Sequence, residues 1–194
     1  DGRRVKKTVR LLIKTQELSW GSSPDEDWSN VQLNYKSYYD LPRDLKVSIR
    51  ERILIFKDAL PTDLMPSLYH VADAFVLPTH GEGWGLPLME AMAAGLPTIA
   101  TNWGGQTEFM NDKNAYVLGY EMVQTSQEGG HLWAEPNATE LRQAMWDVVR
   151  QGSLARSRAE RGCREVHTLF TPEATAHRAV GLIAQLHGNA ASRK

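Results

Sequence analysis

Residues 77–92 read LPTHGEGWGLPLMEAM, and this stretch predicts the fold. The apolar run from Ala74 to Leu77 has no polar alternation, as expected of a strand that is covered on both faces. Three glycines follow between Gly81 and Gly85. A segment of good helix formers then runs from Leu86 to Ala94, with Gly95 as a C-terminal stop. In an open parallel sheet, a loop between such a strand and helix lies at the carboxyl ends of the strands, where ligands bind.

Short apolar runs alternate with helical patterns along the rest of the chain. Further strands are predicted at Val9 to Ile13, Ile53 to Phe56, Pro97 to Thr101 and Ala115 to Leu118. Further helices are predicted from Thr62 towards Val71, from Leu141 to Val149 behind an Asn137–Glu140 capping box, and from Thr171–Pro172 towards Leu186. Two stretches are predicted to be irregular: Gln16 to Asn30 and Tyr120 to Asn137. The alternation indicates an α/β protein, a Rossmann-like parallel sheet flanked by helices, and we expect the strand at 74–77 to be central.

Length and composition narrow the class of protein. The 194 residues suit a single domain, and a formal net charge of -1 gives no reason to expect nucleic acid as a partner. We expect no transmembrane segment, because no apolar stretch reaches the length of a membrane span. The single cysteine, Cys163, excludes an internal disulfide and fits a cytoplasmic location. Because the sequence opens at Asp1 without a methionine, we expect a fragment of a longer protein.

The glycine-rich loop carries the chemistry. Its glycines let backbone N–H groups turn towards a ligand, and the following helix adds the partial positive charge of its N-terminus. Phosphate is the usual occupant of such a site. Two carboxylates accompany it, Glu82 in the loop and Glu90 on the helix, and a carboxylate suits the vicinal hydroxyls of a ribose or hexose. Alternatively, Glu82 caps the helix and Glu90 lies on a solvated face.

These residues resemble a known family. Glu82 and Glu90, with seven residues between them and Glu82 inside the sequence GEGWGLP, resemble the E-x7-E signature of retaining GT-B glycosyltransferases, of the family 4 type. The likeness extends through residues 68–78, 90–100, 104–108 and 170–174. It implies that this domain is the C-terminal half of a GT-B fold, and that it binds a nucleoside diphosphate sugar for transfer to an acceptor hydroxyl with retention of the anomeric configuration.

The resemblance also implies roles for individual residues. Glu82 would be the catalytic residue beside the transferred sugar, and Glu90 would hold the ribose of the nucleotide. The remaining donor-binding residues would be Gly83, Trp84, Gly85 and Leu86 through their N–H groups, and Phe56 and Lys57, with Asp58, beside the base. The nucleotide sugar is a substrate in this scheme, so no cofactor and no metal are expected.

One family feature is missing. Members carry an Arg and a Lys five positions apart, before the strand that matches Val9 to Ile13, and Arg3, Arg4, Lys6 and Lys7 do not show that spacing. The pair would stabilise the charge of the leaving diphosphate. The acceptor would bind through an N-terminal domain that the sequence lacks. We therefore expect the isolated chain to be inactive, and a binding module without activity stays as the alternative.

Other candidate sites are weaker. Asp25-Glu26-Asp27 has the DxD form of metal-dependent transferases but no further ligand nearby, and the histidines show no zinc spacing. A dinucleotide oxidoreductase is disfavoured, because the loop lacks a G-x-G-x-x-G motif that opens the first helix of a βαβ unit. Of the tryptophans, Trp103 is of interest because it precedes Gly104-Gly105 at the expected crevice.

Overall fold

The computed structural model describes residues 9–14, 52–56, 60–124 and 130–191, and the chain divides into two compact units, Asp1–Pro61 and Thr62–Lys194. In the first unit, β1 (Leu11–Lys14) pairs in parallel with β2 (Ile53–Phe56). Both strands were predicted, although β1 begins two residues later than expected. The prediction of an irregular segment at Gln16 to Asn30 lies outside the described residues.

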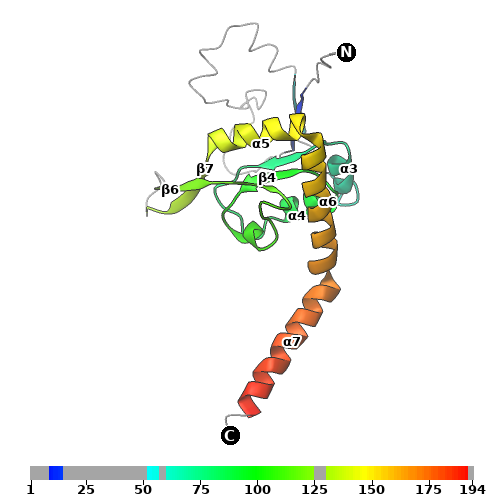
Figure 1. The fold of residues 1–194 in the computed structure, drawn as a ribbon, viewed down its shortest axis with the longest axis vertical. Coiled ribbons are helices and arrows are strands. Elements are labelled where there is room, and N and C mark those ends of the chain that lie inside the picture. Colours follow the sequence, from blue (N-terminus) through cyan, green and yellow to red (C-terminus); the bar gives the residue numbers. More distant parts are fainter. Residues whose placement is uncertain (1–8, 15–51, 57–59, 125–129, 192–194) are drawn as a thin grey trace. The chain divides into compact units, whose positions relative to one another are not determined.

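The second unit is built on a parallel sheet (Figure 1). Within the described residues its order is β3 (Phe75–Leu77), β4 (Thr98–Thr101) and β5 (Tyr116–Leu118). The parallel arrangement was predicted, but the expectation of β3 at the centre was wrong. The middle strand is β4, which pairs with a neighbour on each side and is buried at every residue. The residues of β3 are half-buried.

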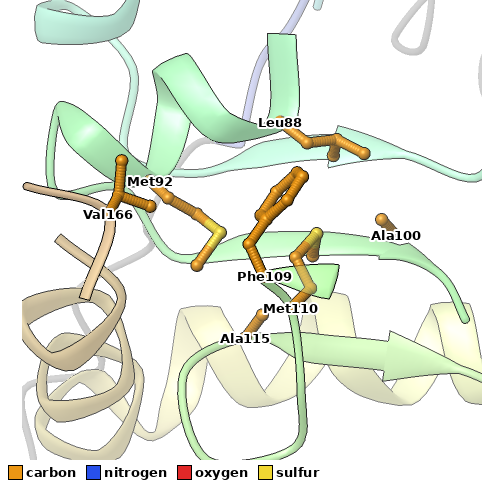
Figure 2. Close-up of a cluster of buried hydrophobic side chains, with 7 residues drawn as sticks. All are labelled: Leu88, Met92, Ala100, Phe109, Met110, Ala115 and Val166. Carbon is orange, nitrogen blue, oxygen red and sulfur yellow. The ribbon is translucent and has the colours of Figure 1, made fainter. Parts of the chain in front are cut away.

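Successive residues of β4 face two different cores. Ala100 faces the core shown in Figure 2, which contains Leu88 and Met92 of α4 (Leu86–Ala93) and Val166 of α6 (Gly152–Leu169). Ile99 faces the opposite core, against α5 (Ala138–Arg150). Figure 1 shows α4 and α5 on opposite sides of the sheet. The sheet is therefore covered on both faces, as the predicted α/β fold requires.

Helix α4 was predicted to within one residue of its end, and its stop signal acts as expected. Gly95 follows the helix with φ of 77°, a conformation that glycine adopts at little cost. The N–H of Gly95 donates to the carbonyl of Met92, and the N–H of Leu96 donates to that of Ala91. These two bonds are those of a Schellman motif, so α4 ends sharply and the chain turns into β4.

Other helix starts were partly predicted. Asn137 caps α5, its side chain accepting from the N–H groups of Thr139 and Glu140. Thr171 likewise accepts from Ala174 at the start of α7 (Pro172–Ala191). Thr62 was wrong as a cap, because α3 (Met65–His70) begins three residues later. Pro66 lies in the first turn of α3, which its fixed φ and missing N–H suit, and the helix has no side-chain cap.

One helix and one pair of strands were not predicted. Helix α6 buries mainly small residues (Ala155, Ala159, Gly162 and Val166), which give a weak apolar signal. The prediction of an irregular stretch from Tyr120 to Asn137 was wrong, because β6 (Tyr120–Gln124) and β7 (Leu132–Pro136) form an antiparallel pair. The two strands pair from Tyr120 opposite Pro136 to Gln124 opposite Leu132. Among the described helices, none is long and apolar enough to cross a membrane.

Candidate functional site

The candidate site begins where β3 ends, at residues 78–85. Thr79 folds the start of this loop back on itself: its hydroxyl donates to the carbonyl of Gly81 (2.9 Å) and accepts from the N–H of Gly81 (3.2 Å). Such a local bond substitutes for a backbone turn. It directs the chain at once towards Glu82 and the start of α4.

A second glycine-rich loop, after β4, holds the first by backbone contact. The N–H of Gly105 donates to the carbonyl of Glu82 (3.2 Å). A Cβ atom at Gly105 would lie 2.1 Å from the carbonyl oxygen of Gly83 and 2.7 Å from the Cα of Trp84. One at Gly104 would lie 2.7 Å from the carbonyl oxygen of Glu82. Only glycine allows this approach, so the two loops fix one another without side chains between them.

Gly85 and Gln106 complete the base of the loop. Gly85 is the N-terminal cap of α4 with φ of 83°, and an added Cβ there would touch Leu88 and Gln106. Gln106 is 1% exposed, and its amide nitrogen donates to the carbonyl of Thr101 (3.0 Å). Its amide oxygen has no hydrogen-bond partner among the described residues. Gln106 was not predicted as a site residue; its position directly after two glycines was the available signal.

The loop and the first turn of α4 present free backbone donors. In the described part of the chain, the N–H groups of Gly83, Trp84, Gly85 and Leu86 donate to no backbone carbonyl and no side chain. Unpaired donors at a helix N-terminus attract an anion. The site therefore has the geometry to hold phosphate oxygens or sugar hydroxyls.

The two glutamates differ in their surroundings. Glu82 is half-buried in the loop, and it does not cap α4, since that helix has no side-chain cap. Glu90 is exposed on α4, and its Oε2 accepts a 2.7 Å hydrogen bond from the hydroxyl of Tyr69 on α3. The alternative of a capping Glu82 is wrong. Glu90 does lie on an exposed face, as its alternative expected, and there it also accepts from Tyr69. Tyr69 was not predicted as a site residue; the available signal was a tyrosine within a predicted helix, since a buried hydroxyl needs a partner.

Burial, the hydrogen bond to Glu90 and the charge of that carboxylate, in this order of size, raise the pKa of Tyr69 far above its ordinary value. Its hydroxyl therefore stays protonated across the pH range of ordinary assays. The direction of the bond is fixed: Tyr69 donates and Glu90 accepts.

Aromatic side chains gather around the loop. Trp84 packs against Phe109, with ring centroids 5.7 Å apart. His80, at the start of the loop, stacks on Trp133 of β7 at 4.4 Å, and its Nε2 lies 2.7 Å from a carboxylate oxygen of Glu135. The hairpin thus contacts the loop through His80.

Trp103, the tryptophan singled out in the sequence, pairs with Tyr120 of β6 at 5.3 Å and keeps 39% of its surface exposed. It is next in the chain to Gly104, where an added Cβ would lie 2.7 Å from the carbonyl oxygen of Glu82. Its ring is therefore available at the edge of the loop.

The structure brings most of the predicted site residues onto one segment: Glu82, Gly83, Trp84, Gly85, Leu86 and Glu90. Phe56 is the last residue of β2, in the other unit, and Lys57 lies outside the described residues. Their contact with the base stays a prediction. No group of three His, Cys, Asp or Glu that could hold a metal occurs in the described residues, and Asp25 and Asp27 lie outside them.

Residues 6–150 match the family described as glycosyl transferases group 1. The chain belongs to this family. Among curated relatives, it is 35% identical over 120 residues to a D-inositol 3-phosphate glycosyltransferase of Corynebacterium diphtheriae, covering 58% of this chain and 27% of that protein. The match thus spans about a quarter of the length of that relative.

Two solved structures share the fold. Sucrose-phosphate synthase from Thermosynechococcus elongatus has a TM-score of 0.60 at 22% identity, covering 93% of this chain and 39% of that one. Anabaena HepE, in complex with UDP and glucose, has a TM-score of 0.54 at 15% identity, covering 73% of this chain and 34% of that one. The fold of the group 1 chain is the mixed α/β, Rossmann-like fold of GT-B glycosyltransferases, with a parallel sheet and flanking helices.

Proposed function

We propose that this chain is the donor-binding, C-terminal half of a retaining, family 4-type GT-B glycosyltransferase. The observation that carries the proposal is the segment 82–90, which holds two glutamates and, between them, four backbone N–H groups without a partner in the described part of the chain. Donors of this kind suit a diphosphate, and the glutamates suit hydroxyl groups on either side of it. The family match to group 1 glycosyl transferases and the UDP and glucose of Anabaena HepE support the same donor class.

In this proposal the N–H groups of residues 83–86 hold the diphosphate and sugar hydroxyls, Glu90 holds the ribose diol, and Glu82 holds hydroxyls of the transferred sugar. During transfer the bond from the anomeric carbon to the diphosphate oxygen breaks, and a bond to the acceptor oxygen forms. The acceptor loses its proton, and the nucleoside diphosphate leaves. Backbone donors that are already oriented stabilise the charge that develops on the leaving group.

The reaction needs an acceptor, which we propose binds to a domain other than this one. We also propose that no divalent metal takes part, the helix N-terminus and protein cations acting instead. A nucleotide-sugar-binding module without activity of its own is the second candidate. Adding EDTA should leave nucleotide binding unchanged; binding lost with EDTA and restored by manganese would instead favour Asp25 and Asp27 as ligands.

Calorimetric titration of the two glutamate variants tests the proposal. The ligands are UDP, GDP and ADP and the corresponding glucose or mannose derivatives. Charge-assisted bonds to the ribose contribute about 1.5–3 kcal/mol, so Glu90→Gln should weaken nucleoside diphosphate binding about ten- to a hundredfold. Glu82→Gln should leave the affinity for the bare diphosphate intact and remove the additional affinity that the sugar provides. In the intact enzyme it should also lower turnover.

Charge alone predicts the opposite sign, which sharpens the test. Removing a carboxylate near a diphosphate reduces repulsion, so a variant without specific contacts should bind slightly more tightly. Glu121→Gln is the matched control, because Glu121 is exposed on β6 and makes no side-chain hydrogen bond in the described structure. The proposal is wrong if Glu90→Gln behaves like this control while keeping the wild-type unfolding temperature.

A further inference from the structure

Tyr69 and Glu90 are joined across two helices. The hydroxyl of Tyr69 on α3 donates to Glu90 Oε2 on α4 at 2.7 Å, linking residues 21 apart in the chain. Tyr69 is 8% exposed, and its ring meets that of Phe75 edge-on at 5.8 Å. It also belongs to the buried cluster with Ala91 and Leu96. The ring is therefore held by packing, and only its hydroxyl reaches the exposed carboxylate.

This bond leaves most of the Glu90 carboxylate available. A phenol donates one hydrogen, whereas an ionised carboxylate offers about four acceptor positions on its two oxygens. Within the described residues, Glu90 Oε1 has no partner, and Tyr69 is the only side chain that contacts Oε2 by a hydrogen bond. One oxygen is anchored, and the other is left to accept from a ligand. A free glutamate on a helix surface would instead exchange between rotamers.

We infer that Tyr69 is a positioning residue for the donor site: its hydroxyl fixes the rotamer of Glu90 so that the carboxylate is already oriented for the ribose diol of a nucleoside diphosphate. This inference rests on the proposed role of Glu90. An unanchored glutamate must lose its rotamer freedom when the ligand binds, and preorganisation removes that cost. The protonated state of Tyr69, favoured by burial and by the adjacent carboxylate, keeps the anchor in place near neutral pH.

A purely structural role is the competing explanation. In that case the bond would only hold α3 against α4, and its loss would lower the unfolding temperature and weaken every ligand alike. A positioning role affects only ligands that possess the diol. Nucleotides with and without the ribose hydroxyls therefore distinguish the two explanations.

The experiment titrates the full chain with three nucleotide pairs: UDP, GDP and ADP, each beside its 2′,3′-dideoxy analogue. Tyr69→Phe keeps the ring and removes the hydroxyl. Immobilising one side chain costs about 0.5–1.5 kcal/mol. Tyr69→Phe should therefore weaken binding of the ribose-containing nucleoside diphosphate about three- to tenfold. Binding of the dideoxy analogue should change less than about twofold. Combined with Glu90→Gln, Tyr69→Phe should have no further effect, because the group it positions is gone.

Two further variants complete the design. Tyr116→Phe is the matched control, since Tyr116 is buried and its hydroxyl makes no hydrogen bond to a carboxylate among the described residues. It should bind every nucleotide like the wild type. Glu90→Asp keeps the charge but withdraws the carboxylate from the Tyr69 hydroxyl by one methylene, and it should lose affinity for the diol-bearing nucleotides selectively.

The outcomes separate the inference from the function on which it rests. If Glu90→Gln weakens a diphosphate and Tyr69→Phe does not, the positioning role is overturned and the ribose role of Glu90 stands. Equal weakening of both members of a nucleotide pair by Tyr69→Phe also overturns it, in favour of the structural role. If Glu90→Gln binds normally, or no nucleotide binds, the proposed function fails and the positioning role fails with it.

Discussion

Helices α4 and α7 are both rich in apolar residues, and the structure uses them in opposite ways. The eight residues of α4 bury Leu88, Ala91 and Met92 to 1% exposure or less. The twenty residues of α7 leave Val180, Leu182, Ile183 and Leu186 between 55% and 70% exposed. The short helix α4 is thus stabilised by packing against its neighbours, whereas the long helix α7 depends mainly on its own backbone hydrogen bonds. The candidate site is built on the packed helix, α4.

This difference has a physical cause. An isolated helix shorter than about 12–15 residues is marginal in water, so α4 cannot persist without its neighbours. The contacts that stabilise α4 also fix the backbone donors at its start, because Gly85 caps the helix and packs against Leu88. The same packing therefore serves stability and ligand binding. Substitutions in the two regions should differ in size, and in one case in sign.

The largest effect is expected at the contact between the glycine-rich loops. Gly105→Ala would place Cβ 2.1 Å from the carbonyl oxygen of Gly83, and backbone atoms cannot rotate away as a side chain can. We expect a loss on the order of 4 kcal/mol in the free energy of unfolding, measured by urea denaturation. Gly81→Ala is the control in the same loop, because its Cβ would meet nothing within 4 Å. Equal stability of the two variants would mean that the two glycine-rich loops do not make this close backbone contact.

A second pair compares leucines of the two helices. Leu88 is fully buried in the core of Figure 2, whereas Leu186 on α7 is 70% exposed. Leu88→Ala should cost about 3 kcal/mol through lost burial and the cavity left behind, and Leu186→Ala should change stability by less than about 0.5 kcal/mol. Denaturation midpoints measured side by side would check this. A large loss at Leu186 would show that α7 is packed in solution, which would end the contrast.

The same contrast explains what the sequence could reveal. The loop, α4 and Gly95 were predicted because their signals are local: glycines, an apolar helical run and a stop residue within 20 positions. Helix α6 escaped notice because the residues it buries are mostly alanine and glycine, whose role appears only when α4 packs against it. Hairpin β6–β7 was not predicted, because cross-strand pairs such as Val123 with Trp133 join residues that no local sequence pattern connects.

The candidate site divides in the same manner. The sequence placed both glutamates and the free N–H groups on one segment, because one stretch of chain carries them all. It did not reveal that Tyr69 anchors Glu90 or that Gln106 supports the loop, since each contact depends on where another element packs. Whether Phe56 and Lys57 contact the base remains a prediction.

A third prediction concerns acid stability on α6, which packs against α4. Glu165 accepts from the buried amide of Asn114 and from Arg161. Burial alone would raise the pKa of Glu165, but the hydrogen bonds from Asn114 and Arg161 and the charges of Arg161 and Arg164 lower it below its ordinary value. A lowered folded-state pKa gives stability that is present above the ordinary value of 4.5 and is lost as pH falls through the folded value.

Glu165→Gln should therefore cost about 1.5 kcal/mol near neutral pH and make the loss of stability below pH 4.5 shallower. The measurement is the free energy of unfolding from pH 7 down to pH 3. Glu160→Gln is the control, because Glu160 is exposed on the same helix and makes no side-chain hydrogen bond in the described structure. Parallel pH curves for Glu165→Gln and the wild type would contradict the assigned ion pair and amide bond.

The smallest expected effect is a gain in stability. The same change, glycine to alanine, is made in the exposed helix α7 and in the packed helix α6. Gly181 lies within α7 with nothing within 4 Å of its Cβ position, so Gly181→Ala should stabilise that helix by roughly 0.5–1 kcal/mol through backbone entropy. Gly162 lies within α6, where a Cβ would meet Met92 Cε at 2.9 Å and the Asn114 carbonyl at 3.0 Å. Gly162→Ala should lose stability although its intrinsic helix propensity rises by the same amount. Hydrogen exchange of the α7 amides should slow about two- to fivefold in Gly181→Ala, and urea denaturation should show the loss in Gly162→Ala. A loss of stability in Gly181→Ala would mean that a neighbouring segment packs against α7, so that α7 would not differ from the packed helices.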